Sequence, residues 1–294
     1  QFGQHGQQTF GNHGARLGRP AQCRGRVMPG SCQGRGGVVT VRRWPWASTF
    51  GAVSSLAAAR PARARLGRWP YDDRVAHLVL LDHQMEPSSA DVTAWVKQAT
   101  EQGARAVRTG ALFPNAAPAF VEHGFRVADT LTLLARDLRE PITSTHSSRR
   151  RGDTVATRLR RLRPAMLDEA AAIDRRSFST PWANDSTALA DILRATPYHR
   201  SRAVWSDRRM VGFAISGRAD RSGYVQRLAV DPSARRSGIA AVLVDDALQW
   251  MQRRNVSNAM VNTAADNLPA LALYESFGFE RQPVSLVILE RALP

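Results

Sequence analysis

The chain has 294 residues, 43% of them hydrophobic, so it is long enough for two domains and for a buried core. Its formal net charge is +16, but 11 arginines precede the first acidic residue, Asp72, which leaves only +5 for the rest of the chain. This uneven charge argues against an extended basic surface for nucleic acid over the folded part.

Residues 1–41 are rich in Gln, Gly and Arg, and they contain too few apolar residues to offset the entropy of chain ordering. We predict that this segment is disordered. Both cysteines, Cys23 and Cys32, lie in it, so we expect no disulfide in the core and no metal site. Because the sequence begins with Gln, a fragment or a reading frame extended upstream of a start near Met28 or Val39 stays open.

Arg42 and Arg43 precede an apolar stretch over 44–59, a pattern similar to a twin-arginine export signal. Serine and threonine residues interrupt that stretch, so a first helix is favoured over an export signal. No run reaches the roughly 18 apolar residues that a membrane-spanning helix needs. We therefore expect a cytoplasmic protein with no membrane partner.

The segment after Trp69 alternates between strand and helix patterns. Its hydrophobic periodicity predicts strands over 76–83, 104–112 and 129–138, and helices over 89–103 and 117–124. The stretch 141–157 is polar and basic without periodicity, which indicates a linker. We therefore predict a first domain over 42–140.

The second block, 158–294, repeats the alternation at greater length. Its pattern predicts strands over 158–164, 201–207, 210–218, 223–231, 258–265 and 284–293, and helices over 165–178, 185–196, 238–254 and 268–278. Strands outnumber helices in the middle and then alternate with them. This order indicates a mixed α/β sheet with helices on its faces.

Parts of the two blocks are similar to each other. Residues 119–138 align with 273–293 across one gap, and in both stretches a glycine, Gly124 or Gly278, is followed by Phe before a terminal strand. A duplicated unit explains this similarity economically, with chance similarity in an Ala-rich chain as the alternative.

A basic turn joins the predicted strand 223–231 to the predicted helix 238–254. A helix N-terminus presents unpaired N–H groups and the positive end of the peptide dipoles, so it attracts anions. Gly238 removes a side chain where a phosphate would press against the backbone, and Arg235 and Arg236 add positive charge. This junction is a candidate phosphate or diphosphate site, with a plain turn as the alternative.

Three separated elements resemble the GNAT acyltransferase superfamily. Arg235-x-x-Gly238-x-Ala240 is similar to its signature for the pyrophosphate of acetyl-coenzyme A. The stretch 227–232 resembles its core strand and turn, and 267–279 its Asn-x-x-Ala-x-x-Leu-Tyr-x-x-x-Gly-Phe element. The resemblance covers about residues 158–293.

The resemblance implies a fold and a branch of the superfamily. The implied fold is a mixed, mostly antiparallel sheet flanked by helices, a catalytic domain over 158–294, and a degenerate GNAT-like domain over 42–140. The stretch 178–182, Phe-Ser-Thr-Pro-Trp, further resembles the RimI-type branch, which acetylates protein N-termini.

The resemblance also assigns a role to each matching residue, with acetyl-CoA as the cofactor. The pyrophosphate loop comprises Arg235, Arg236, Ser237, Gly238, Ile239, Ala240 and Ala241, whose backbone amides from 236 to 241 would hold the diphosphate. The strand edge with Leu228 and Val230 would pair with the pantetheine arm, and the Leu228 amide would polarise the thioester carbonyl. Asn267 would bind the arm. Tyr274 would protonate the departing thiolate, since a phenol of pKa near 10 can donate to a thiolate.

The general base is not evident in the sequence. Asn262 and Tyr224 occupy the positions where related enzymes often carry a glutamate, and neither takes up a proton at neutral pH. A water chain, Glu275, Asp266 or His199 are alternatives. So is an acceptor with a low amine pKa, which favours an α-amine, of pKa about 7.7 to 8.0, over a lysine side chain.

The first block lacks the motifs that would bind the cofactor and donate the proton. It has no Arg-x-x-Gly-x-Ala loop, and Phe120 stands where Tyr274 stands in the second block. The leading hypothesis is an N-acetyltransferase that acts on a peptide N-terminus or a small-molecule amine. A non-catalytic acyl-CoA sensor, and a nucleic-acid-binding protein that uses the Arg-rich segments such as 149–163, are the alternatives.

Overall fold

The computed structural model describes residues 62–81, 85–140 and 158–294. All of them belong to one unit, Ala58–Pro294. The predicted disordered segment, the predicted helix 44–59, both cysteines and the predicted linker lie outside the described residues. Within the described part, no helix is long and apolar enough to cross a membrane.

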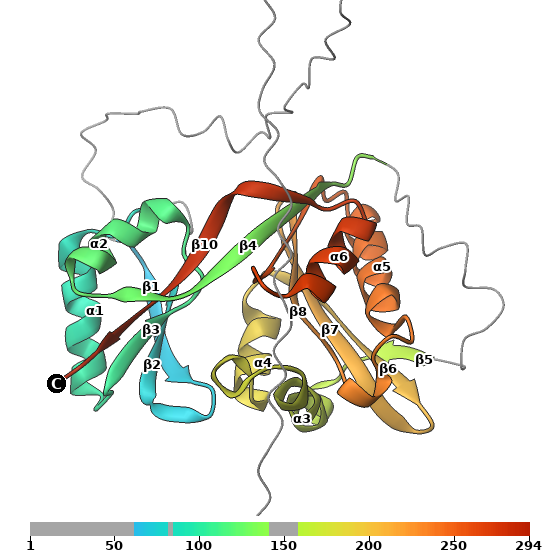
Figure 1. Ribbon diagram of the computed structural model, residues 1–294, viewed down its shortest axis with the longest axis horizontal. Coiled ribbons are helices and arrows are strands. Elements are labelled where there is room, and N and C mark those ends of the chain that lie inside the picture. Colours follow the sequence, from blue (N-terminus) through green and yellow to red (C-terminus); the bar gives the residue numbers. More distant parts are fainter. Residues whose placement is uncertain (1–61, 82–84, 141–157) are drawn as a thin grey trace, which may run out of the picture. The chain divides into compact units, whose positions relative to one another are not determined.

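The described strands form one ten-stranded sheet in the order β1-β2-β3-β10-β4-β9-β8-β7-β6-β5 (Figure 1). The pairs β2–β3 and β8–β9 are parallel and the other pairs are antiparallel. Helices pack against the sheet, so the predicted mixed, mostly antiparallel sheet flanked by helices is confirmed.

The first half of the described chain contains four strands and two helices. They are β1 (Ala64–Trp69), β2 (Asp72–Leu80), α1 (Ser89–Glu101), β3 (Ala106–Thr109), α2 (Ala117–Glu122) and β4 (Arg126–Asp137). The sequence analysis missed β1, because this edge strand carries Arg65 and Arg68 and fully buries only Trp69. An edge strand with one buried residue lacks the apolar run by which the other strands were recognised.

The second half adds six strands and four helices. They are β5 (Arg158–Arg161), α3 (Leu167–Ser177), α4 (Ser186–Arg194), β6 (Tyr198–Ser206), β7 (Arg209–Ala219), β8 (Ser222–Val230), α5 (Ile239–Gln252), β9 (Asn258–Ala264), α6 (Leu268–Ser276) and β10 (Glu280–Ala292). On β7, Phe213 and Ile215 pack in the core beneath α3 and α4, whereas Ala214 packs with Ile239 and Leu243 of α5. Alternate residues of a strand face opposite sides, so β7 is buried on both faces and reads as one apolar run.

The sheet order has an internal symmetry. Reading outward from the β10–β4 pair, β3, β2 and β1 follow on one side and β9, β8 and β7 on the other. The last strand of each half is therefore inserted beside the other half: β4 pairs with β9, and β10 pairs with β3. The strands of the two predicted domains thus share one continuous sheet through an exchange of their final strands.

The helix and turn before each exchanged strand also match. Gly124 and Gly278 follow α2 and α6 with φ of 78° and 75°, the left-handed conformation that glycine adopts without strain. Phe125 packs edge-on against Phe120 with ring centroids 5.2 Å apart, and Phe279 packs in the same way against Tyr274 at 5.7 Å. These matched positions support the interpretation of a duplicated unit.

Candidate active site

The N-terminus of α5 is an open array of hydrogen-bond donors. Its N-cap, Gly238, has φ 78° and ψ 2°, and Arg236 also lies in the left-handed region with φ 64°. Among the described residues, no acceptor is bonded to the backbone N–H groups from Arg236 to Ala241. Successive N–H groups in such a turn form a concave anion-binding site at the positive end of a helix.

The backbone conformation at position 238 favours glycine. A Cβ at this position would meet no atom within 4 Å, so the protein leaves the space above the turn open. The left-handed conformation is the physical reason for glycine here, a reason that the sequence pattern did not supply.

Charged side chains surround this turn. Arg235 and Arg236 are exposed, and Arg235 donates to the Ser177 carbonyl at 3.2 Å. Asp231 precedes the turn, and its carboxylate accepts hydrogen bonds from Arg176 at 2.7 Å and from Arg209 at 2.9 Å. Although burial opposes it, hydrogen bonds from Ser233 and Arg176 hold the pKa of Asp231 well below its usual range. The Asp231 carboxylate is therefore ionised and already bonded to Ser233, Arg176 and Arg209. Arg235 and Arg236 of the loop are exposed to solvent.

Strand β8 separates from β9 beside this turn. The two strands pair only from Ser222 to Tyr224, opposite Asn258 to Met260. Just beyond, the register of β8 with β7 shifts at Gln226, which marks a β-bulge. A bulge bends its strand, so residues 225–230 diverge from β9. The edge that carries Leu228 and Val230 is thereby left without a partner on the β9 side.

Tyr274 lies on the buried face of α6, with 6% of its surface exposed. Burial raises the pKa of its phenol to about 12, and the Arg227 guanidinium opposes part of that rise. The group therefore carries its proton throughout the physiological pH range. Such a phenol can act as a general acid.

Asn267, the N-cap of α6, uses its side chain within the protein. Its oxygen accepts from the Ala270 N–H at 3.3 Å, and its amide nitrogen donates to the Thr263 hydroxyl at 3.1 Å. This arrangement fixes the start of the helix that carries Tyr274. Contact of Asn267 with a cofactor arm stays a prediction.

One hydrophobic cluster brings three of the predicted site elements together. It includes Ala241 from the first turn of α5 and Tyr274 from α6, and Leu228 of β8 packs against it. The elements that carry the donor array, the free strand edge and the buried phenol therefore converge on a common core.

The candidate bases are arranged as follows. Asn262 is exposed on β9. Burial raises the pKa of Tyr224, so this phenol does not accept a proton at neutral pH. Glu275 pairs with Arg281 at 2.7 Å, and Asp266 and His199 are exposed. The identity of the base remains a prediction.

The corresponding helix N-terminus in the first half is closed. Ser88 caps α1 by accepting from the Asp91 N–H, and the Asp91 carboxylate accepts in turn from the Ser88 N–H at 2.9 Å. This capping box satisfies donors that are free in α5 and places a negative charge in the first turn. An anionic diphosphate would meet repulsion there.

A buried ion pair that the sequence analysis missed adjoins the free strand edge. Arg227 of β8 donates from Nε and Nη2 to the two oxygens of Asp174 at 2.6 Å each, and Asp174 is fully buried. An aspartate on the apolar face of the helix 165–178 was the available signal in the sequence.

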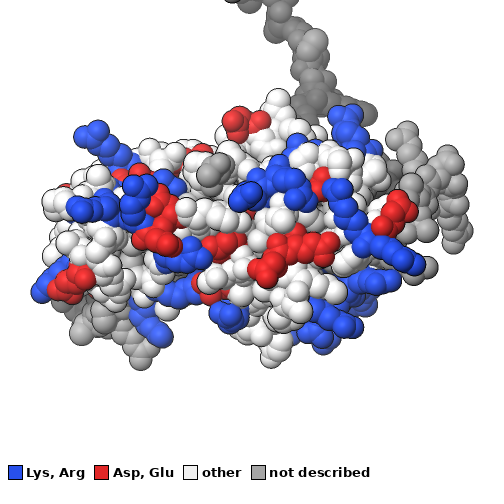
Figure 2. All heavy atoms as spheres, turned by 90° about the horizontal axis from the view of Figure 1, so that it is seen from below, with Lys and Arg blue, Asp and Glu red and all other residues white. Residues whose placement is uncertain are grey.

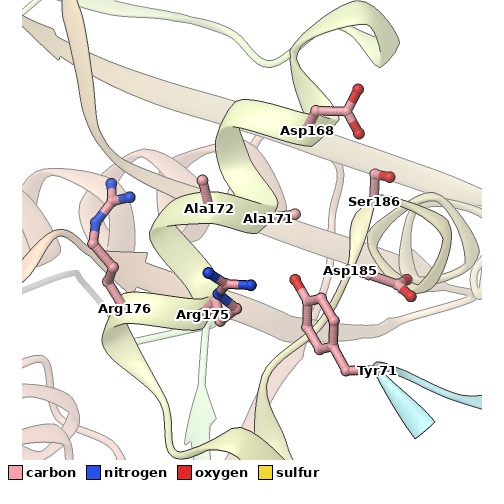
Figure 3. Close-up of a pocket in the computed structure, with 8 residues that line it drawn as sticks. All are labelled: Tyr71, Asp168, Ala171, Ala172, Arg175, Arg176, Asp185 and Ser186. Carbon is pink, nitrogen blue, oxygen red and sulfur yellow. The ribbon is translucent and has the colours of Figure 1, made fainter.

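A pocket of about 480 Å³ lies beside α3. Tyr71, from the turn between β1 and β2, reaches it from the first half, and residues of α3 and the start of α4 complete it (Figure 3). None of the residues predicted to hold acetyl-CoA lines this cavity. Within the described residues, no group of His, Cys, Asp or Glu side chains could hold a metal ion.

The face of the molecule seen in Figure 2 carries both signs of charge. Basic side chains are spread over it, and acidic side chains gather between them near its centre. In the described part of the chain, several arginines form ion pairs with aspartates, as in Arg65–Asp191 and Arg68–Asp185. This face is not a continuous basic surface.

A comparison with known protein families assigns a class to the C-terminal region. Residues 165–279 match the model of the acetyltransferase (GNAT) family. Residues 165–279 are therefore a GNAT acetyltransferase domain.

The chain is also similar to individual acetyltransferases and to a solved tandem GNAT structure. The chain is 26% identical over 118 residues to the [ribosomal protein bS18]-alanine N-acetyltransferase of Escherichia coli (strain K12), which covers 40% of this chain and 77% of that protein. It is 44% identical over 59 residues to N-alpha-acetyltransferase 30 of Saccharomyces cerevisiae, which covers 20% of this chain and 34% of that one. A tandem GNAT protein from the clavulanic acid biosynthesis pathway has a similar fold, with a TM-score of 0.55, 14% identity and 79% of each chain covered.

Proposed function

We propose that the protein transfers the acetyl group of acetyl-CoA directly to an amine, with a peptide N-terminal α-amine as the favoured acceptor. The observation that carries this proposal is the array of free N–H groups at the start of α5, beside the unpaired edge of β8. The relative from Escherichia coli is named for transfer to an alanine of a ribosomal protein, which supports an α-amine acceptor. A cytoplasmic location belongs to the same proposal.

The residues present fit acetyl-CoA. The N–H groups from Arg236 to Ala241 would hold its diphosphate, and the edge of β8 at Leu228 and Val230 would pair with its pantetheine arm. When bound, acetyl-CoA supplies an activated thioester. The Leu228 N–H would donate to the thioester carbonyl oxygen and stabilise the negative charge that develops on it.

Proton movements complete the reaction. The neutral amine forms a C–N bond to the acetyl carbon, the C–S bond breaks, and the sulfur takes the proton of the Tyr274 hydroxyl. The amine loses one proton to water or to a base, and the Tyr274 phenolate regains a proton from water. Because the phenol of Tyr274 has a pKa of about 12, it is protonated whenever the amine is neutral near pH 8.

The test has two stages. Calorimetry on the full chain measures acetyl-CoA binding, and release of free thiol then measures transfer to peptides that carry either a free N-terminus or only a lysine amine. We expect kcat/KM with the α-amine to rise with pH and level off above about 8, where that amine is neutral. With the lysine amine it should be lower at neutral pH and rise to about pH 10.

Two results would contradict this proposal. Absence of acetyl-CoA binding would refute both the enzyme and the sensor hypothesis. Binding without thiol release from any amine would favour the non-catalytic sensor, which is the alternative consistent with Asn262 at the usual position of the base.

A further inference from the structure

The segment 178–186 runs from the end of α3 to the first residue of α4, and one arginine, Arg227, fixes it to β8. Arg227, the residue before Leu228, donates to the Trp182 carbonyl at 2.8 Å, and its guanidinium lies 3.6 Å from the centre of the Phe178 ring. The Asn184 N–H donates to Asp174 at 2.6 Å. Arg227 directly precedes Leu228, whose N–H would polarise the thioester carbonyl, so this segment adjoins the place that the acceptor amine must approach.

The first half of the chain holds the same segment from the other side. The indole N–H of Trp69 donates to the Pro181 carbonyl at 2.8 Å, and the Tyr71 hydroxyl donates to the Asn184 carbonyl at 3.2 Å. These two contacts and Arg227 satisfy three carbonyl groups within four residues of an irregular segment. The first half therefore supplies backbone partners that the second half does not provide.

Side chains reinforce these backbone contacts. The rings of Trp69 and Trp182 meet edge to face with centroids 5.8 Å apart, and Arg68 forms an ion pair with Asp185. The Arg108 guanidinium lies 4.5 Å from the Trp69 ring centre and 5.5 Å from that of Trp182. Arg108 also pairs with Glu290 on β10, the strand that crosses into the first half. The contact is therefore tied into the sheet and not only into a surface turn.

We propose that the first half of the chain, which has neither the open helix N-terminus nor the phenol, sets the affinity for the acceptor by holding the segment 178–186. Trp69 and Arg68 are positioning residues in this role, because they act through Pro181, Trp182 and Asp185. Acetyl-CoA binding, which depends on α5 and β8, does not require them. This inference rests on the proposed acetyl transfer.

The test compares Trp69→Phe with Trp95→Phe in the full chain. Trp69→Phe keeps an aromatic ring but removes the donor to Pro181, whereas Trp95 stacks on Phe120 in the core of the first half, 6.1 Å between centroids. We expect Trp69→Phe to raise the acceptor KM about three- to tenfold, the effect of one lost hydrogen bond, and to leave the Kd for acetyl-CoA within about twofold. Trp95→Phe should change neither.

A second pair of variants addresses the ion pair. Arg68→Gln should raise the acceptor KM in the same direction, and Arg74→Gln, on the same hairpin but paired with Asp72, should not. Hydrogen exchange gives an independent readout: amides of 178–186 should exchange faster in Trp69→Phe, and those of 236–241 should be unchanged.

The outcomes separate this inference from the proposed function. If the wild-type chain binds no acetyl-CoA and transfers to no amine, the proposed function is refuted. If the wild type is active but Trp69→Phe matches it in acceptor KM and in exchange of 178–186, the inference is refuted. An equal loss of affinity for acetyl-CoA and acceptor would also refute it, since that result indicates a general loss of structure.

Discussion

Tyr274 and Phe120 occupy matching places in the two halves, each packed edge-on against the Phe that follows a left-handed glycine. The two side chains differ by one hydroxyl group. In the second half that hydroxyl is buried and keeps its proton, because burial raises the pKa of Tyr274 to about 12. Both rings therefore share a packing role, whereas the proposed proton-donating role needs a hydroxyl group that only Tyr274 has.

Tyr274→Phe tests that difference. The ring and its packing remain, as the natural Phe120 demonstrates, but the leaving thiolate loses its proton donor. We expect kcat to fall by about a hundredfold or more, the usual scale of general acid catalysis, and the Kd for acetyl-CoA to stay within about twofold. Thiol release and calorimetry check the two quantities.

Tyr198→Phe is the control for loss of a phenol elsewhere, because Tyr198 is exposed on β6 and its ring faces Arg218. Unchanged kcat in Tyr274→Phe would exclude this phenol as the proton donor.

At the scale of elements, α1 and α5 differ at their N-termini, because side chains bond to the first N–H groups of α1 but not to those of α5. Ser88 and Asp91 close the N-terminus of α1 with a capping box. The N-cap of α5 is Gly238, which has no side chain, and the first turn of α5 carries no acidic residue. The helix N-terminus is therefore capped by its own side chains in the first half, whereas in the second half it can accept an anion.

Gly238→Asn and Gly238→Asp form a matched pair that tests this difference. Both residues tolerate the left-handed conformation, and the space around a new Cβ is open, so both should fold with a similar, modest loss of stability. Only Asp adds a negative charge where the diphosphate would bind. We expect its Kd for acetyl-CoA to exceed that of the Asn variant by about tenfold at low salt, with a smaller gap at high salt. Equal Kd values would contradict a diphosphate site at this helix.

At the scale of the whole molecule, the exchange of β4 and β10 joins the two halves through main-chain pairing. Leu134 and Leu138 at the end of β4 pack in the core of the second half, and Leu289 and Leu293 of the C-terminal strand pack in the core of the first. Each half thus completes its core with residues of the other. The boundary at 141–157 stays a prediction about the sequence, because the sheet itself continues across both sides.

This pairing predicts that residues 158–294 do not fold alone. Without β4, the edge of β9 and the apolar surface covered by Leu134 would be exposed, which favours aggregation. Size-exclusion chromatography and circular dichroism should show aggregates or an unfolded chain, and co-expression with 58–140 should restore a soluble complex.

The control is the full chain with a protease site inserted in 141–157, whose two pieces should stay together after cleavage. A monomeric 158–294 fragment with cooperative unfolding would contradict the prediction.

The amino-acid sequence alone determined the fold class, the family resemblance and the order of most elements. These features depend on local periodicity and on short motifs, such as the loop around Gly238 and the stretch that contains Tyr274, which a single stretch of chain contains in full. The sequence also indicated the similarity of the two halves through the repeated Gly-Phe pairs.

Only the tertiary structure decided which strands pair and which distant residues meet. The exchange of β4 and β10 leaves no local signature, because a strand carries the same alternation whichever neighbour it pairs with. The bulge at Gln226, the pairing of Arg227 with Asp174, and the contact of Trp69 with Pro181 join residues that no sequence period relates. Contacts between residues far apart in the sequence depend on how the two halves pack against each other, and that packing exists only in the folded chain.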